Sequence, residues 1–201
     1  MTARAIERFR PRIVAMSGIC AGVPEVADPG TVIVADPCWE YQAGKWAQDK
    51  FKMEPYSASI RPTFRTHINQ IILQDPHGLK LKEDLGFEEL RYCKIMIAPL
   101  ATGSAVVANK QYFARVGDQH RKMAGLEMEM YGVYKAAELS TSLPLYFGAK
   151  TVVDAGDSDK GDTLHVYGSI VSARFIVGVI KSVLLGEPRV RAELYGESAI
   201  R

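Results

Sequence analysis

Residues 13–22 read Ile13-Val14-Ala15-Met16-Ser17-Gly18-Ile19-Cys20-Ala21-Gly22, an apolar run that passes directly into small residues. The apolar part, residues 13–16, shows no polar alternation, which predicts a strand that is covered on both faces. The small residues 17–22 predict a turn that allows a ligand to approach the backbone at the carboxyl end of the strand. A ligand pocket is therefore expected where this strand ends.

The rest of the chain repeats this pattern of apolar strands and amphipathic helices. Strands are predicted over residues 31–35, 94–100, 123–126 and 146–153, and helices over residues 2–9, 66–73, 109–117, 128–139 and 164–185. Strands that alternate with helices predict a three-layer α/β fold, with a central mixed, mostly parallel sheet flanked by helices. Residues 1–186 are expected to form one domain, residues 36–90 a variable insert within it, and residues 187–201 a charged tail.

Charge and hydropathy narrow the class of partner. The chain has 201 residues, of which 47% are hydrophobic, and its 25 basic and 23 acidic side chains leave a net charge of +2. This balance gives no electrostatic reason to expect a nucleic acid or an anionic membrane as partner. No uncharged apolar run approaches the roughly 20 residues that a membrane span needs. The expected partner is a small molecule.

The cysteines point to the compartment. Cys20, Cys38 and Cys93 are an odd number of widely spaced residues, without a Cys-x-x-Cys pair and without a histidine at metal-ligand spacing. They are interpreted as reduced thiols. The first ten residues lack the apolar region of a signal peptide. We therefore expect a cytoplasmic protein that uses neither a metal nor another cofactor.

Glu127 and Glu129 flank Met128 where a short strand is predicted to turn into a helix, and alternation there points both carboxylates in one direction. The vicinal hydroxyls of a ribose are donors, and ionised carboxylates are the strongest side-chain acceptors for them. Met128 would then cover the face of the sugar. The alternative is a pair of solvated glutamates at a helix start, where the helix dipole favours acids.

Asp154 follows the last predicted strand and opens a small, acidic turn. A partly desolvated carboxyl group at a strand end is suited to hold a proton and to deliver it as a general acid. The alternative is a helix cap. Asp157, Asp159 and Asp162 also invite comparison with a calcium loop, but the run lacks the twelve-residue ligand pattern with its terminal glutamate.

Five blocks in order resemble the nucleoside phosphorylase and nucleosidase superfamily, and most closely the methylthioadenosine and adenosylhomocysteine nucleosidases. The blocks are Gly18-Ile19-Cys20-Ala21-Gly22, Val32-Ile33-Val34-Ala35-Asp36, Ala101-Thr102-Gly103-Ser104-Ala105-Val106-Val107, Gly125-Leu126-Glu127-Met128-Glu129-Met130-Tyr131 and Val153-Asp154-Ala155-Gly156-Asp157. The Glu-Met-Glu block is the most diagnostic of them. The resemblance implies a phosphorylase/hydrolase-like fold and cleavage of the N-glycosidic bond of an adenine-type nucleoside or nucleotide.

The resemblance also implies a role for individual residues. Met128 and Glu129 would hold the ribose hydroxyls, with support from Glu127, and Asp154 would protonate the departing purine at N7. The implied wall and floor of the pocket are the backbone at Val106 and Val107 beside the base, and Gly18, Ile19 and Cys20 beneath the sugar or the nucleophile.

Two departures from the superfamily pattern leave alternatives open. Its phosphorolytic members carry an arginine and a serine for phosphate where this chain has Met16 and Ile19. An apolar floor favours water as the nucleophile, although Arg61, Arg65 or the arginine of a neighbouring subunit would rescue phosphorolysis. Family members also begin with strands, one of them carrying a water-activating glutamate, and this chain begins at the helix that follows them.

The second departure predicts a sheet that lacks the family's first strands and has an exposed edge. A non-catalytic nucleoside-binding or effector module of a larger signalling or defence protein is therefore the third alternative. The resemblance further implies a homodimer that completes its pockets across the interface. Residues 39–51, rich in aromatic side chains, are either part of that interface or part of the core.

Overall fold

The structure is a computed structural model, and it describes residues 1–48, 50–54, 56–105, 107, 109–156 and 162–185. Its strands are β1 (Ile13–Gly22), β2 (Val32–Glu40), β3 (Gly44–Ala47), β4 (Lys50–Met53), β5 (Ser57–Ala58), β6 (Ile95–Thr102), β7 (Gly125–Glu127) and β8 (Leu145–Asp154). Its helices are α1 (Thr2–Phe9), α2 (Pro62–Gln74), α3 (Leu79–Lys82), α4 (Lys110–Gly117), α5 (Met130–Glu138) and α6 (His165–Leu185), with 3-10 turns η1 (Glu88–Leu90) and η2 (Asp162–Leu164). The tail predicted over residues 187–201 lies outside the described residues.

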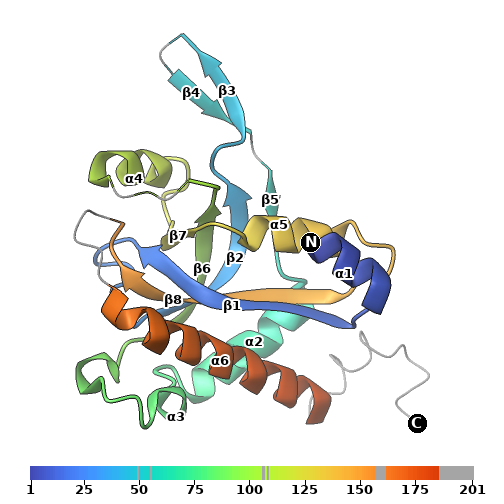
Figure 1. Ribbon diagram of the computed structural model, residues 1–201, viewed down its shortest axis with the longest axis vertical. Coiled ribbons are helices and arrows are strands. Elements are labelled where there is room, and N and C mark those ends of the chain that lie inside the picture. Colours follow the sequence, from blue (N-terminus) through green and yellow to red (C-terminus); the bar gives the residue numbers. More distant parts are fainter. Residues whose placement is uncertain (49, 55, 106, 108, 157–161, 186–201) are drawn as a thin grey trace.

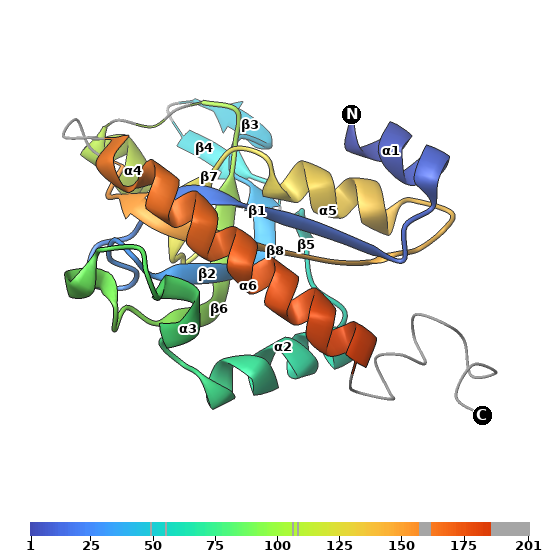
Figure 2. The same cartoon turned by 60° about the horizontal axis from the view of Figure 1, so that its bottom comes forward.

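A mixed sheet lies between two layers of helices. Figures 1 and 2 show α1 and α5 on one side of the sheet and α2, α3 and α6 on the other. The strand order is β5-β2-β6-β7-β1-β8, and β8 also pairs with β2. Strands β1 and β8, β2 and β6, and β6 and β7 are parallel, whereas β7 is antiparallel to β1 and β2 is antiparallel to β5 and β8. The predicted α/β architecture is confirmed.

The ladder between β1 and β8 forms the centre of the fold. It runs from Ile13 opposite Leu145 to Ala21 opposite Asp154. Residues 17–22, predicted as a turn, instead continue β1, because small residues are compatible with a strand that pairs closely with β8. The register shifts between Cys20 and Ala21, so that β8 carries one extra residue there.

Helix α6 covers this ladder. It is long and apolar enough, with a hydropathy of 1.7, to cross a membrane as judged by length and composition alone. One face of the helix, however, packs on β1 and β8 and buries Tyr167, Val171, Phe175 and Val179. Burial of that face against the sheet is what is expected of a core helix.

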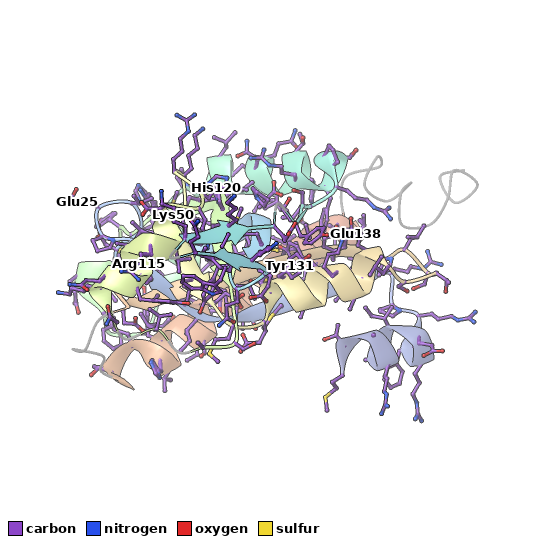
Figure 3. The ribbon with its side chains drawn as sticks, turned by 90° about the horizontal axis from the view of Figure 1, so that it is seen from above. Glu25, Lys50, Arg115, His120, Tyr131 and Glu138 are labelled. Carbon is purple, nitrogen blue, oxygen red and sulfur yellow. The ribbon has the colours of Figure 1, made fainter. Side chains whose placement is uncertain are left out.

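The segment predicted as a variable insert contains regular structure. Strand β2 extends through it to Glu40, and the hairpin β3–β4 then projects from the body of the protein (Figure 1). Helix α2 begins at Pro62, four residues before the predicted start at residue 66, because proline is favoured in the first helical turn. The lysines of the hairpin, Lys45, Lys50 and Lys52, are exposed; Lys50 is labelled in Figure 3.

The aromatic residues of the segment divide between core and surface. Trp39 and Tyr41 are buried, and the indole nitrogen of Trp39 donates a hydrogen bond to Gln119. Trp46, on the hairpin, is 67% exposed and contacts Phe51, with 5.4 Å between the ring centroids. The core interpretation therefore holds for Trp39 and Tyr41, and Trp46 remains available for an interface.

Candidate active site

A cavity of about 440 Å³ opens where β1, β7 and β8 end. Its volume lies within the range of small-molecule sites. Eight of the nine residues predicted to form a site line it, namely Gly18, Ile19, Cys20, Val107, Glu127, Met128, Glu129 and Asp154. The ninth, Val106, lies outside the described residues. Residues far apart in the sequence are thus brought together by the sheet, as expected at the carboxyl ends of strands.

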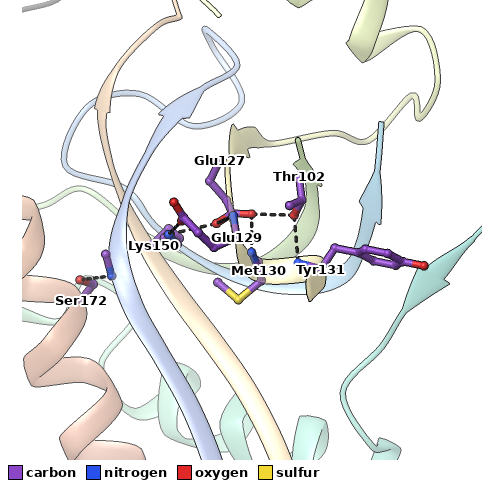
Figure 4. Close-up of polar contacts among 8 residues, drawn as sticks. Thr102, Glu127, Glu129, Met130, Tyr131, Lys150 and Ser172 are labelled. Atoms are coloured by element: carbon purple, nitrogen blue, oxygen red, sulfur yellow. Dashed lines mark hydrogen bonds and ion pairs between the residues drawn. The ribbon is translucent and has the colours of Figure 1, made fainter. Parts of the chain in front are cut away.

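Glu127 is the fixed part of the site. It is the last residue of β7, and its side chain is only 1% exposed. Its Oε1 accepts hydrogen bonds from the Thr102 hydroxyl at 2.6 Å and from the Met130 backbone N–H at 2.8 Å, and its Oε2 accepts one from the Glu129 N–H at 2.9 Å (Figure 4). Glu127 therefore satisfies free N–H groups at the start of α5. The alternative of a solvated glutamate is wrong for this residue.

Lys150, which is not among the residues predicted to form the site, joins the two glutamates. Its Nζ lies 3.0 Å from Glu127 Oε2 and 3.0 Å from Glu129 Oε2 (Figure 4). Burial lowers the pKa of the Lys150 ammonium, but the charges and hydrogen bonds of the two glutamates outweigh it and bring the pKa above its ordinary value. The available signal was a single charged residue inside the apolar run of residues 145–153.

Glu129 and Met128 form the accessible part of the site. The side chain of Glu129 is 54% exposed and Met128 is 41% exposed, and both line the cavity. Both glutamates reach the same ammonium group, as the prediction that they point in one direction requires. The exposed Glu129 is able to meet a ligand, whereas the oxygens of Glu127 are already engaged by Lys150 and the protein backbone.

Asp154 lines another part of the cavity, at the end of β8. Its Oδ1 accepts a hydrogen bond from the Gly156 N–H at 2.7 Å. This bond orders the turn that follows the strand; α6 begins later, at His165. Val153, the residue before Asp154, also borders the cavity, but its side chain faces α6: a β-carbon on Gly168 would lie 2.6 Å from its Cγ1.

The calcium-loop residues are outside what the structure describes. Asp157 and Asp159 are not among the described residues, nor is the side chain of Asp162. Within the described part of the chain, no group of three His, Cys, Asp or Glu residues is placed to hold a metal ion.

The remaining walls of the cavity are apolar. Val107 and Val153 are 5% and 6% exposed, and Met16 and Ile19 lie along β1. Cys20 also lines the cavity, and burial raises the pKa of its thiol well above the ordinary value. A protonated thiol and aliphatic side chains provide a surface for a flat, weakly polar group such as a purine.

Neither arginine that was considered as a phosphate ligand is in the cavity. Arg65 Nε pairs with Asp36 Oδ2 at 2.6 Å, and Arg61 donates a hydrogen bond to the Leu143 carbonyl at 2.8 Å. Among the described residues that line the cavity, Lys150 is the one cation, against the three carboxyl groups of Glu127, Glu129 and Asp154. The expectation that Arg61 or Arg65 supplies charge for phosphate is not supported by these contacts.

No model of a known protein family matches the chain. It is 31% identical over 188 residues to the uncharacterized protein y4jS of Sinorhizobium fredii, an alignment that covers 90% of this chain and 46% of that protein. It is 25% identical over 186 residues to the ATP nucleosidase Cap17 of Escherichia coli, covering 86% of this chain and 36% of Cap17. The chain therefore spans less than half the length of these curated relatives.

Solved structures establish the fold. The 5′-methylthioadenosine/S-adenosylhomocysteine nucleosidase of Helicobacter pylori superposes with a TM-score of 0.72 at 14% identity, over 90% of this chain and 73% of that one. The predicted likeness to this superfamily is confirmed at the level of the fold.

Proposed function

We propose that this chain, which has the fold of the nucleoside phosphorylase and nucleosidase superfamily, hydrolyses the N-glycosidic bond of an adenine-type nucleoside or nucleotide and releases the free base. The observation that carries the proposal is the combination of Glu129 and Asp154 in one cavity with apolar walls. A polar group for the sugar, an acid for the leaving group and a surface for the base are what the reaction requires. The similarity to an ATP nucleosidase supports the same reaction class.

The proposed reaction assigns each residue a separate task. Glu129 accepts hydrogen bonds from the ribose hydroxyls, Met128 covers the sugar, and Val107 contacts the base together with Val106. Asp154 gives its proton to purine N7 while the bond between the anomeric carbon and N9 breaks, and the electron pair of that bond stays with the base. A water molecule bonds to the resulting oxocarbenium-like carbon and releases its proton to bulk water, from which Asp154 is protonated again. Neutralisation of the base makes it a competent leaving group.

The charge of the cavity favours water over phosphate as the nucleophile. A phosphate dianion would meet the carboxylates of Glu127 and Glu129, which already share the one ammonium among the described residues of the cavity, that of Lys150. The floor at Met16 and Ile19 offers apolar side chains in place of donors. Coulomb repulsion in a partly desolvated cavity is expected to exclude phosphate from this position. Hydrolysis is therefore preferred to phosphorolysis.

The pairing of β1 supports a further part of the proposal. One edge of β1 pairs with β8 along Ile13–Ala21, whereas on the other edge only Ala21 and Gly22 pair, with β7. Within the described residues, the edge from Ile13 to Cys20 thus has no second strand. We propose that the strands that precede this position in the superfamily would pair here, whichever polypeptide supplies them, to complete a mostly parallel sheet next to the cavity.

We also propose that the protein acts in the cytoplasm as a homodimer, on a small molecule and without a nucleic-acid or membrane partner. The thiols of Cys20, Cys38 and Cys93 are free, which fits a reducing compartment. Trp46 supplies an exposed aromatic side chain of the kind that is enriched at interfaces.

The experiment that tests the proposal is a base-release assay. The protein is incubated with adenosine, methylthioadenosine, inosine and ATP, with and without inorganic phosphate, and free base is followed by chromatography. Release that is independent of phosphate supports hydrolysis, and release that requires phosphate contradicts it. Binding of a nucleoside without release of base would instead favour a non-catalytic binding module.

A further inference from the structure

We propose that Lys150 is a positioning residue for the sugar: it holds the Glu129 carboxylate in place through one oxygen and leaves the other oxygen to the ribose hydroxyls. This inference rests on the proposed function and assigns a role to a residue outside the predicted set. It is carried by the geometry of the Glu127–Lys150–Glu129 group.

The first step is that Lys150 is anchored independently of Glu129. Its side chain is 4% exposed, and it lies on β8, which pairs with β1 on one edge and with β2 on the other. Glu127, its first partner, is itself fixed by the Thr102 hydroxyl and by two backbone N–H groups. The ammonium group therefore has a position that is set by the sheet, whether or not Glu129 is bound to it.

The second step is that Glu129 has no comparable support of its own. Its side chain is 54% exposed and makes no capping hydrogen bond to α5. Among the described residues, its one side-chain hydrogen bond is accepted by Oε2 from Lys150 Nζ, at 3.0 Å. A mobile glutamate would lose side-chain entropy each time that it bound a diol. A glutamate held by Lys150 has already lost most of that entropy before the diol binds.

The third step is that the arrangement does more than neutralise a buried charge. Glu127 by itself would be sufficient to pair with Lys150. The second bond, to a half-exposed carboxylate at the cavity wall, is one that a purely structural pair does not need. Because Oε2 of Glu129 is occupied, Oε1 is the oxygen left for a ligand, which fixes both the position and the direction of the acceptor.

The test is a double-mutant cycle between Lys150→Met and Glu129→Gln, read by kcat and KM for release of adenine from the best substrate. Each single variant is expected to lower kcat/KM by about 10- to 100-fold, the range for loss of a hydrogen bond to a charged group. If Lys150 acts through Glu129, Lys150→Met should cost less than about twofold when Glu129→Gln is already present. Lys150→Arg, which keeps the charge, should recover most of the activity.

Folding is controlled separately, because Lys150→Met leaves Glu127 buried without its cation. The variant pair Lys150→Met with Glu127→Gln removes both charges, and thermal unfolding identifies which variants fold. The folded double variant should show the same loss of kcat/KM as Lys150→Met, whereas an exposed lysine on α6, changed by Lys181→Met, should leave it unaltered.

The outcomes separate this inference from the proposed function. If the two single effects multiply in the double variant, Lys150 does not act through Glu129, and the inference is overturned while the nucleosidase function stands. Full activity in folded Lys150→Met protein has the same meaning. If the wild-type chain neither releases base nor binds any of the nucleosides, the proposed function fails and this inference fails with it.

Discussion

Gly18 leaves the space that Lys150 occupies: a β-carbon at residue 18 would lie 3.1 Å from the Lys150 Nζ and 3.3 Å from its Cδ. The two residues face each other across the β1–β8 ladder. The backbone N–H of Gly18 is in turn held by the Ser172 hydroxyl at 3.0 Å, so β1 is fixed from the side of α6 (Figure 4). The Lys150 side chain therefore lies between the backbone of β1, which Ser172 holds, and the carboxylates of Glu127 and Glu129.

Gly18→Ala is expected to lower base release about tenfold, because the added methyl group displaces an ammonium that positions Glu129. The loss should appear in kcat/KM at a temperature where the variant is fully folded. Gly132→Ala is the matched control, since a β-carbon at residue 132 meets nothing within 4 Å. It should keep its activity and gain about 0.5–1 kcal/mol of stability from helix propensity. Equal activity in both variants would argue against close packing at Gly18.

Asp154→Asn is expected to abolish turnover while leaving most of the affinity for nucleoside, because the amide has no acidic proton to give to purine N7. Glu129→Gln should weaken binding more, because it replaces a charged acceptor of the ribose hydroxyls. Affinity is measured by calorimetry and turnover by chromatography of the free base. Retention of full activity in both variants would show that the site has been assigned wrongly.

Glu127→Ala is expected to cost about 3–5 kcal/mol of unfolding free energy, the loss typical of a broken buried ion pair. The change leaves the Lys150 ammonium without its buried partner and the Thr102 hydroxyl and two backbone N–H groups without their acceptor. Urea unfolding measures it. Glu138→Ala, which breaks the more exposed pair with Lys135, is the comparison and should cost less than about 1 kcal/mol. Similar costs for the two variants would contradict the anchoring role of Glu127.

Stability is expected to decline as the pH rises above about 9. Burial raises the pKa of Tyr146 and Tyr167 to about 12 from the ordinary 10.0, and it raises the pKa of the Cys38 thiol above 9.0. The unfolded chain releases these protons first, so their contribution is complete below the unfolded values and is lost as the pH rises through the folded ones. Urea unfolding between about pH 8 and 11 should show the decline. Tyr167→Phe should make it shallower, and the exposed control Tyr92→Phe should not.

If the protein forms the proposed homodimer, Trp46→Ser is expected to shift it toward the monomer, because the change removes the largest exposed aromatic side chain of the β3–β4 hairpin. Light scattering coupled to size-exclusion chromatography measures the mass. Tyr56→Ser, at an exposed aromatic residue outside the hairpin, serves as the control. A wild-type chain that is monomeric at all concentrations tested would remove the basis for this interface.

Much of the fold follows from sequence pattern because its elements are regular. The helix at Thr2–Phe9 and the apolar runs of β1, β6 and β8 were predicted at or near their observed positions, since each has one dominant periodicity. The hairpin β3–β4 was missed because alternating lysines and aromatic residues have no buried face to mark them as strands. The prediction of a turn at residues 17–22 is wrong because small residues are compatible with both a turn and a closely paired strand. The partner strand, β8, decides between the two.

Site residues such as Glu129 and Asp154 are predictable from the sequence, because each carries a reactive carboxyl group and also lies in a block that resembles the superfamily. Sequence pattern does not predict Lys150 as a site residue, because its role depends on three strands. Strand β7 carries Glu127, β8 carries the lysine, and β1 leaves space for it at Gly18. None of these neighbours is close to Lys150 in the sequence. A lone charge in an apolar strand was the one local sign, and only the partners assembled by the sheet explain it.

The extra residue of β8 beside Cys20 and Ala21, Val153, determines where the carboxyl group of Asp154 points. Removal of Val153 would restore the regular pairing register, put the aspartate where Val153 now stands with its carboxyl group toward Gly168 of α6, and leave the ladder below it intact. A single-codon deletion there is thus expected to leave Glu129 in place while it removes the proposed acid from the cavity.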